Sequence, residues 1–88
     1  IDFRMDSISI CNLVRALTKP YVGSHCNYTG DEIKIWEIEK GKNNSKNIEP
    51  GKVIKVYNNQ IEVKTGSTSV ILTKHEFYTL PKINEYLL

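Results

Sequence analysis

The sequence predicts a mainly β fold, a small antiparallel β-barrel of about five to six strands with one N-terminal helix and a short C-terminal helical turn. Apolar residues follow the period of a helix before Pro20. After Gly23 they fall into short runs rich in β-branched and aromatic residues. Closing such strands into a barrel removes exposed sheet edges, and barrels of the oligonucleotide-binding (OB-fold) type use this strand number.

The helix is predicted up to Leu17, because apolar residues at positions 10, 13, 14 and 17 lie on one helical face. Asp6 is the predicted N-cap, since its carboxylate can accept hydrogen bonds from the free amides of the first turn. Pro20 ends the helix, because proline disfavours helical geometry at the preceding residue and supplies no amide hydrogen.

Five strands follow, and their alternating apolar residues are expected to face inward. The predicted ranges are 24–28, 32–39, 52–57, 60–65 and 68–73. The predicted inward pairs are Ile33 with Ile35, Ile54 with Val56, Ile61 with Val63, and Val70 with Leu72. Ile38 has the opposite parity from Ile33, which predicts either a bulge or partial cover on both faces of that strand. Hairpin turns are expected at 29–31 and 57–60.

Residues 41–51 lack a hydrophobic period and are predicted to form an exposed loop. In residues 74–88, apolar side chains at 77, 80, 83, 86 and 87 have a spacing that suits a closing helical turn. Pro81 would stand near the start of that turn. The final Leu87 and Leu88 are expected to be buried against a core or a partner.

The 88 residues are predicted to form one domain, too small for a deep enclosed active site, so we expect no catalysis from this chain alone. No apolar run approaches the ~18 residues that a membrane span requires. The first residue is Ile1 rather than methionine, so we expect the chain to be processed or cut from a longer protein.

The two cysteines, Cys11 and Cys26, are expected to be reduced thiols in a cytoplasmic protein. No group of histidine, cysteine and carboxylate residues has metal-ligand spacing, so no metal is expected. Residues 40–55 contain five lysines and one glutamate, although the formal net charge of the whole chain is only +2. The positive charge is therefore local.

Several motifs occur in a specific order, namely the run 13–23 (LVRALTKPYVG), Gly30, the run 33–36 (IKIW) and the run 49–53 (EPGKV). With the opening Ile1-Asp2-Phe3, this order resembles the C-terminal domain of the methionyl-tRNA formyltransferase family over roughly residues 1–73. The residues that shape this motif are Pro20, Gly23, Trp36, Pro50 and Gly51. The chain departs from the family at Val22, where proline is usual, and at Ser24, where alanine is usual. A nearly neutral stretch, 74–81, replaces the family's basic C-terminal stretch.

The resemblance implies an OB-type barrel attached to an N-terminal catalytic domain of Rossmann-like fold, which is absent from residues 1–88. That domain would hold the catalytic residues and use 10-formyltetrahydrofolate, so no catalytic residue is assigned to this chain and no cofactor is expected in it.

Three functions are open. The first is weak electrostatic binding of the initiator methionyl-tRNA, through Arg15, Lys19, Lys40, Lys42, Lys46, Lys52 and Lys55. The second is a structural or homodimer-forming role in an enzyme that formylates a nucleotide-linked amino sugar. The third is a free-standing barrel that binds single-stranded nucleic acid by stacking bases on aromatic residues. Trp36 is interpreted as a core or domain-interface residue rather than a stacking platform. Of the three functions, the tRNA interpretation ranks first.

Overall fold

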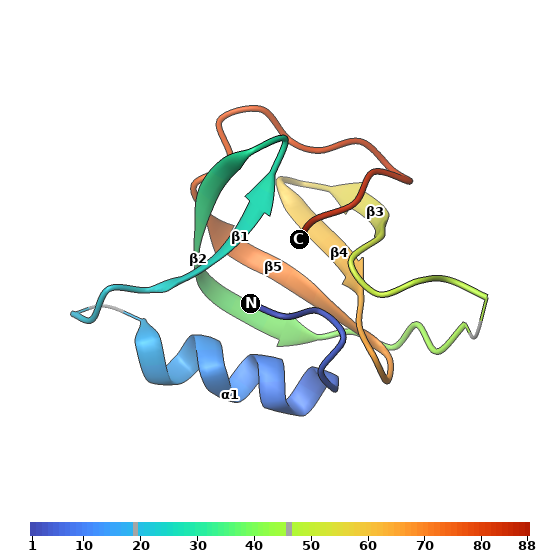
Figure 1. The fold of residues 1–88 in the computed structure, drawn as a ribbon, viewed down its shortest axis with the longest axis horizontal. Coiled ribbons are helices and arrows are strands. Elements are labelled where there is room, and N and C mark those ends of the chain that lie inside the picture. Colours follow the sequence, from blue (N-terminus) through green and yellow to red (C-terminus); the bar gives the residue numbers. More distant parts are fainter. Residues whose placement is uncertain (19, 46) are drawn as a thin grey trace.

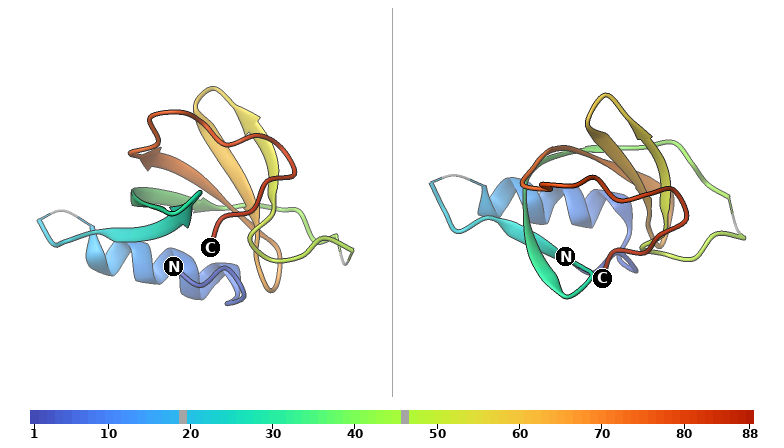
Figure 2. Two further views of the ribbon diagram at one scale, coloured as in Figure 1. Left: turned by 45° about the horizontal axis from the view of Figure 1, so that its top comes forward. Right: turned by 90° about the horizontal axis from the view of Figure 1, so that it is seen from above.

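The computed structural model describes residues 1–18, 20–45 and 47–88. The described part contains one helix, α1 (Ser7–Leu17), and the strands β1 (Ser24–Tyr28), β2 (Asp31–Lys40), β3 (Val53–Tyr57), β4 (Gln60–Lys64) and β5 (Ser69–His75). The strands form one antiparallel sheet in the order β1-β2-β5-β4-β3. The sheet curls, and α1 packs mainly against β2 (Figures 1 and 2). The mainly β class is confirmed, whereas the OB type of barrel stays a prediction.

Helix α1 begins where the sequence predicts. The Asp6 carboxylate accepts a hydrogen bond from the Ser9 amide at 2.9 Å, and this bond lowers the pKa of the Asp6 carboxyl below its ordinary value. The helix ends at Leu17, ahead of Pro20. Its buried face is rotated from the predicted one, because Cys11 is buried while Leu13 and Leu17 are only half-buried.

A buried hydroxyl ties the first turn of α1 to the turn between β4 and β5. The Ser7 hydroxyl lies 2.8 Å from the Thr65 hydroxyl and 2.6 Å from the Thr68 hydroxyl, and it donates to the Ser69 carbonyl at 2.9 Å. The Ser67 hydroxyl oxygen accepts a hydrogen bond from the Ser7 amide. These bonds satisfy polar groups that the core would otherwise leave unpaired.

The core fills the space between the inner face of the sheet and α1. Its fully buried large side chains are Ile10, Val14, Ile35, Val53, Ile61, Val63, Val70, Leu72 and Leu87. The predicted bulge in β2 is confirmed, since its register with β5 shifts on both sides of Glu37, and Ile38 is thereby buried. Both predicted hairpin turns also form, with positive φ at Thr29 and Gly30 in the first and at Asn58 and Asn59 in the second.

One predicted inward pair in β3 is wrong. Val56 packs against the core, but Ile54 does not, and Val53 is fully buried instead. The register between β3 and β4 shifts between Val53 and Lys55, so residues of different parity face the interior on the two sides of the shift. A pattern of alternating apolar residues does not reveal such a shift.

The predicted C-terminal helical turn does not form, because residues 76–88 contain bends, one turn and one isolated bridge but no helix. This segment instead runs between the two edge strands. The Val53 amide donates to the Glu85 carbonyl at 2.7 Å, and Asn27 and Leu88 exchange two backbone hydrogen bonds of 2.8 and 2.9 Å. The segment therefore satisfies backbone groups of both β3 and β1 (Figure 1), which a helix at this position would leave open. Leu87 is buried as predicted, whereas Leu88 is exposed.

Candidate nucleic-acid interface

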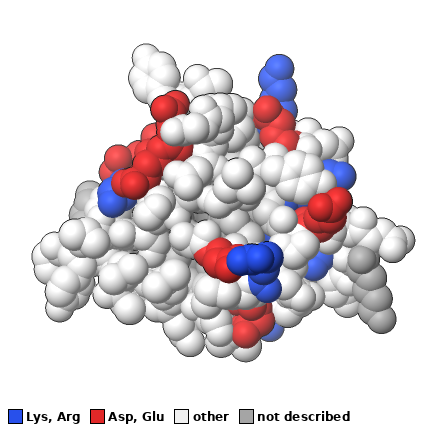
Figure 3. Space-filling model, viewed as in Figure 1, with Lys and Arg blue, Asp and Glu red and all other residues white. Residues whose placement is uncertain are grey.

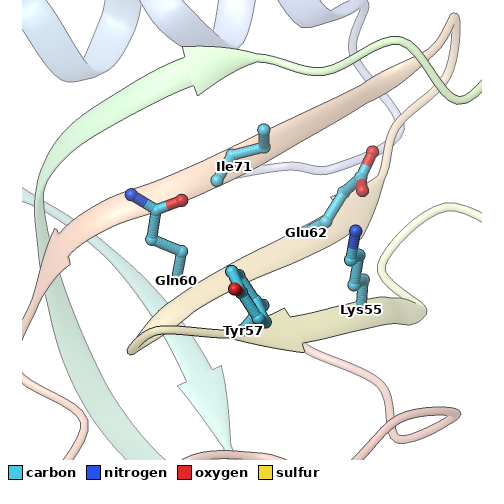
Figure 4. Close-up of a pocket in the computed structure, with 5 residues that line it drawn as sticks. All are labelled: Lys55, Tyr57, Gln60, Glu62 and Ile71. Carbon is cyan, nitrogen blue, oxygen red and sulfur yellow. The ribbon is translucent and has the colours of Figure 1, made fainter.

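A shallow pocket lies on the outer face of β3, β4 and β5, and Lys55, Tyr57, Gln60, Glu62 and Ile71 line it (Figure 4). The Asn58–Asn59 turn places Tyr57 opposite Gln60, and the Tyr57 ring is 65% exposed. The Lys55 ammonium lies 5.8 Å from the centre of that ring. An exposed ring beside a lysine can stack a base and contact a phosphate.

The same pocket also contains a carboxylate. Glu62 accepts a hydrogen bond of 2.6 Å from the Ser69 hydroxyl, which holds it on the sheet. Lys55 and Glu62 are register partners, but their charged groups do not form an ion pair in the described part of the chain. This carboxylate reduces the attraction that the pocket exerts on a phosphate.

Arg15 on α1 and Lys40 at the end of β2 both lie near Cys11. Both positive charges act on the Cys11 thiol, although burial is the larger effect and raises its pKa. Arg15 also lines a groove of about 300 Å³ together with Glu37 and Glu39, but it forms no ion pair in the described part of the chain.

The other candidate lysines are distributed over the segment that leads into β3. Lys42 is exposed in the loop after β2, and Lys52 is half-buried just before β3, with its backbone bridged to Tyr86. Lys19 and Lys46 lie outside the described residues. Since β5 and β4 separate β2 from β3 in the sheet, Lys40 and Lys55 stand on strands that are not neighbours. On the face shown in Figure 3, basic side chains stand singly among acidic ones.

Trp36 packs its ring against the backbone of Gly23. A Cβ atom at Gly23 would lie 2.6 Å from the Trp36 ring, and φ at Gly23 is +82°, so only glycine fits without strain. The indole nitrogen of Trp36 donates to the Glu76 carboxylate at 2.7 Å, and its carbonyl accepts from the Thr18 hydroxyl at 2.9 Å. These contacts hold Trp36 as a structural residue that closes the loop between α1 and β1.

The rest of the motif forms two exposed features around buried glycines. Pro20, Tyr21 and Val22 project from the loop between α1 and β1. At the other site, Pro50 is exposed, while Gly51 has φ +93° and lies against the Leu87 carbonyl, where a Cβ atom would come within 2.6 Å. Glycine is therefore required at position 51 by the close approach of the C-terminal segment.

Residues 1–84 match the family model described as "Formyl transferase, C-terminal domain". The chain belongs to this family. Over 79 residues it is 32% identical to the methionyl-tRNA formyltransferase of Alkaliphilus metalliredigens (strain QYMF), an alignment that covers 88% of this chain and 24% of that relative. The chain thus spans about a quarter of the length of the curated relative that it matches.

Ser24, where the family resemblance predicts alanine, carries a polar group in the interior of this formyl transferase C-terminal domain. Its hydroxyl is buried, and it has no hydrogen-bond partner among the described residues. Such a group loses its bonds to water on folding and gains nothing in return.

The cysteines and histidines of this domain have structural surroundings. Both thiols are free and buried, and burial raises the pKa of Cys26 to about 11. His75 bonds to the Asn59 carbonyl at 2.7 Å and to the Phe77 amide at 3.2 Å. Within the described ranges, no cluster of possible metal ligands occurs, and no helix has the length and apolarity to cross a membrane.

Sequence reasoning missed one charged residue. Lys64 ends β4 on the same face as Glu62, where alternation predicts an exposed side chain, yet it is buried. The loop after β2 covers it, and no local pattern of residues reveals that long-range contact.

Proposed function

We infer that this chain is the C-terminal accessory domain of a 10-formyltetrahydrofolate-dependent formyltransferase, a methionyl-tRNA formyltransferase, and that it contributes weak electrostatic binding of tRNA. The observation that supports this function most directly is the similarity to a methionyl-tRNA formyltransferase over 88% of the chain. The lysine-rich segment 40–55 supplies the charge that such a role requires.

The partner in this proposal is the N-terminal catalytic domain of the same cytoplasmic polypeptide. The pockets described above do not fit the folate cofactor, because they are open and shallow and lie on surfaces that lack a catalytic set of residues. No step of formyl transfer is therefore assigned to this chain. Its own residues would hold the acceptor near the catalytic domain.

The electrostatic argument limits the strength of tRNA binding. Each lysine that neutralises a phosphate releases counterions, which makes the affinity depend on salt concentration. The described lysines of this segment are Lys40, Lys42, Lys52 and Lys55. On the outer face of the sheet, Glu62 is the register partner of Lys55, and Glu39 shares that face through its pairing with Ile71. A few contacts opposed by nearby carboxylates are expected to give weak binding.

A second function is favoured by these same carboxylates and by the nearly neutral stretch 74–81. In an enzyme that formylates an amino sugar on a nucleotide, the domain would be structural or would form a homodimer, and a basic face would be unnecessary. The free-standing nucleic-acid binder has less support, because Trp36 packs on Gly23 and the Tyr28 hydroxyl is bonded to Glu85. Tyr21, Tyr57 and Tyr78 are exposed, and Tyr57 has the Lys55 ammonium 5.8 Å from the centre of its ring.

The test measures tRNA affinity over a range of salt concentrations for the chain and for a variant with Lys42, Lys46 and Lys52 replaced by glutamate. We expect the variant to lose the salt-dependent part of the affinity, since each lost phosphate contact lowers the slope of log affinity against log salt by about 0.7–0.9. A matched control makes the same change at Lys34, Lys74 and Lys82, which lie outside the segment.

Equal losses in both variants would mean that net charge alone matters, and unchanged affinity in both would exclude the tRNA function. Immunoblotting of the source lysate adds an independent check. A band several times larger than the 10.1 kDa of this chain supports the attached catalytic domain, and a band of that size favours a free-standing binder.

A further inference from the structure

Lys64 is a buried cation that has no counter-charge among the described residues. Lys64 is 5% exposed, and its ammonium donates one hydrogen bond of 2.8 Å to the Thr65 carbonyl. In the described part of the chain, no carboxylate lies within ion-pair distance of this ammonium. An ammonium has three donor hydrogens, so two remain for another partner. A buried charge without a partner is costly, which makes a ligand of opposite charge the natural complement.

Lys64 also lines a groove of about 470 Å³. One wall is the loop after β2, and the other is the turn between β4 and β5. The residues that line the groove with Lys64 are Asn44, Ser45, Ile48, Pro50, Thr65, Gly66 and Ser67. None of the described residues that line the groove is acidic, and the volume is in the range of small-ligand sites.

Hydrogen-bond donors come from both walls. No acceptor is found among the described residues for the side-chain amide of Asn44 or for the hydroxyl hydrogens of Ser45 and Ser67. The turn itself is held rigidly, because the Thr65 hydroxyl oxygen accepts from the amides of Ser67 and Thr68, and the Ser67 oxygen accepts from the Ser7 amide. The loop wall is held beside it by the Gly51 amide, which donates to the Lys64 carbonyl at 2.8 Å.

We propose that the groove beside Lys64 is an anion site that binds a phosphate group. A tetrahedral phosphate has acceptor oxygens in several directions, and this matches donors on two opposing walls better than a flat carboxylate does. Two sources present the same chemistry, a free phosphate group and a backbone phosphate of RNA. The inference is independent of the proposed function, because its evidence is the buried charge and the donors rather than the family.

The test titrates the chain with inorganic phosphate at constant ionic strength and follows the NMR resonances of the Thr65, Gly66 and Ser67 amides and the Lys64 side chain. Saturable shifts are expected. Lys64→Met keeps most of the length of the side chain and removes the charge, and we expect it to weaken phosphate binding at least tenfold. The matched control, Lys74→Met, removes an exposed lysine that pairs with Glu37, and it should leave binding unchanged.

A second variant keeps Lys64 and places a negative charge in the groove, which should repel a bound anion. Asn44→Asp introduces a carboxylate into the lining of the groove, so it should also weaken phosphate binding at least tenfold. If Lys64→Met perturbs the fold, the effect of Asn44→Asp shows whether the groove binds phosphate. Absence of saturable shifts in the unaltered chain, or unchanged binding in both variants, would overturn the proposal.

A parallel titration with short single-stranded RNA that lacks terminal phosphates identifies the source. If Lys64→Met lowers RNA affinity and reduces the salt slope by about 0.7, the ligand is a backbone phosphate. If it abolishes binding of inorganic phosphate alone, the ligand is a free phosphate group. Loss of the tRNA function in the salt experiment, with phosphate binding retained, would refute the proposed function and leave this site standing.

Discussion

Replacing Gly23 by alanine tests whether the Trp36 ring holds the loop between α1 and β1. The new Cβ atom would stand 2.6 and 2.8 Å from two carbons of the Trp36 ring, at a backbone φ of +82°. A left-handed conformation costs an alanine about 1–2 kcal/mol, and forcing an extra methyl group into a packed site costs about 1–3 kcal/mol. Gly23→Ala should therefore lower the free energy of unfolding by about 2–5 kcal/mol.

Gly30→Ala is a matched control, since φ at Gly30 is +87° and no atom lies within 4 Å of the place where its Cβ atom would stand. Gly30→Ala should lower the free energy of unfolding only by the cost of the left-handed backbone, about 1–2 kcal/mol. In urea unfolding, the difference of about 1–3 kcal/mol between the two variants corresponds to midpoints about 1–3 M apart, because small proteins have m-values near the lower end of about 1–3 kcal/mol/M. Trp36 is the sole tryptophan, so its fluorescence also reports displacement of the ring.

Equal midpoints for Gly23→Ala and Gly30→Ala would refute the reasoning, because the ring contact would then contribute nothing. A double variant makes the test stricter. In a Trp36→Leu background, followed by circular dichroism, Gly23→Ala should cost no more than Gly30→Ala costs in the unaltered chain. A larger cost there would place the strain somewhere other than the Trp36 ring.

Four further side chains, those of Asp6, Leu87, Ser24 and Cys26, give predictions of their own. Because the folded pKa of Asp6 is lowered, its stabilisation is present above its ordinary pKa of 3.8 and is lost as the pH falls toward the folded pKa. Asp6→Asn keeps a capping oxygen but should flatten this acid limb in urea titrations at several pH values. Leu87→Ala should lower stability by about 2–5 kcal/mol, whereas Leu88→Ala, at an exposed position, should have little effect on the urea midpoint. Ser24→Ala should raise the urea midpoint, because it removes a buried unpaired hydroxyl that costs about 1 kcal/mol of stability. An unchanged midpoint would mean that the hydroxyl finds a hydrogen-bond partner. Cys26, with a pKa of about 11, should resist iodoacetamide at neutral pH until urea unfolds the chain, which mass spectrometry of the labelled protein measures.

Local chemistry made much of this fold predictable. The Asp6 cap, the arrest of α1 ahead of Pro20 and the two-residue turns at Thr29–Gly30 and Asn58–Asn59 each depend on neighbours in the sequence. The β2 bulge was also predictable, because Ile38 breaks the parity of its strand. The candidate site was predicted less well. The segment rich in lysine was visible as composition, but the placement of its lysines on separated strands was not.

Sequence alone determined the class of fold, the limits of most strands and the family, because hydrophobic period, turn chemistry and ordered motifs are written in short stretches of residues. Tertiary structure alone decided the fate of the C-terminal segment, whose helical spacing was overridden by the open backbone groups of β1 and β3. It also decided the burial of Lys64 beneath a loop that comes from elsewhere in the chain. In both cases the deciding contact is made with residues that are distant in sequence, so the local hydrophobic period could not reveal it.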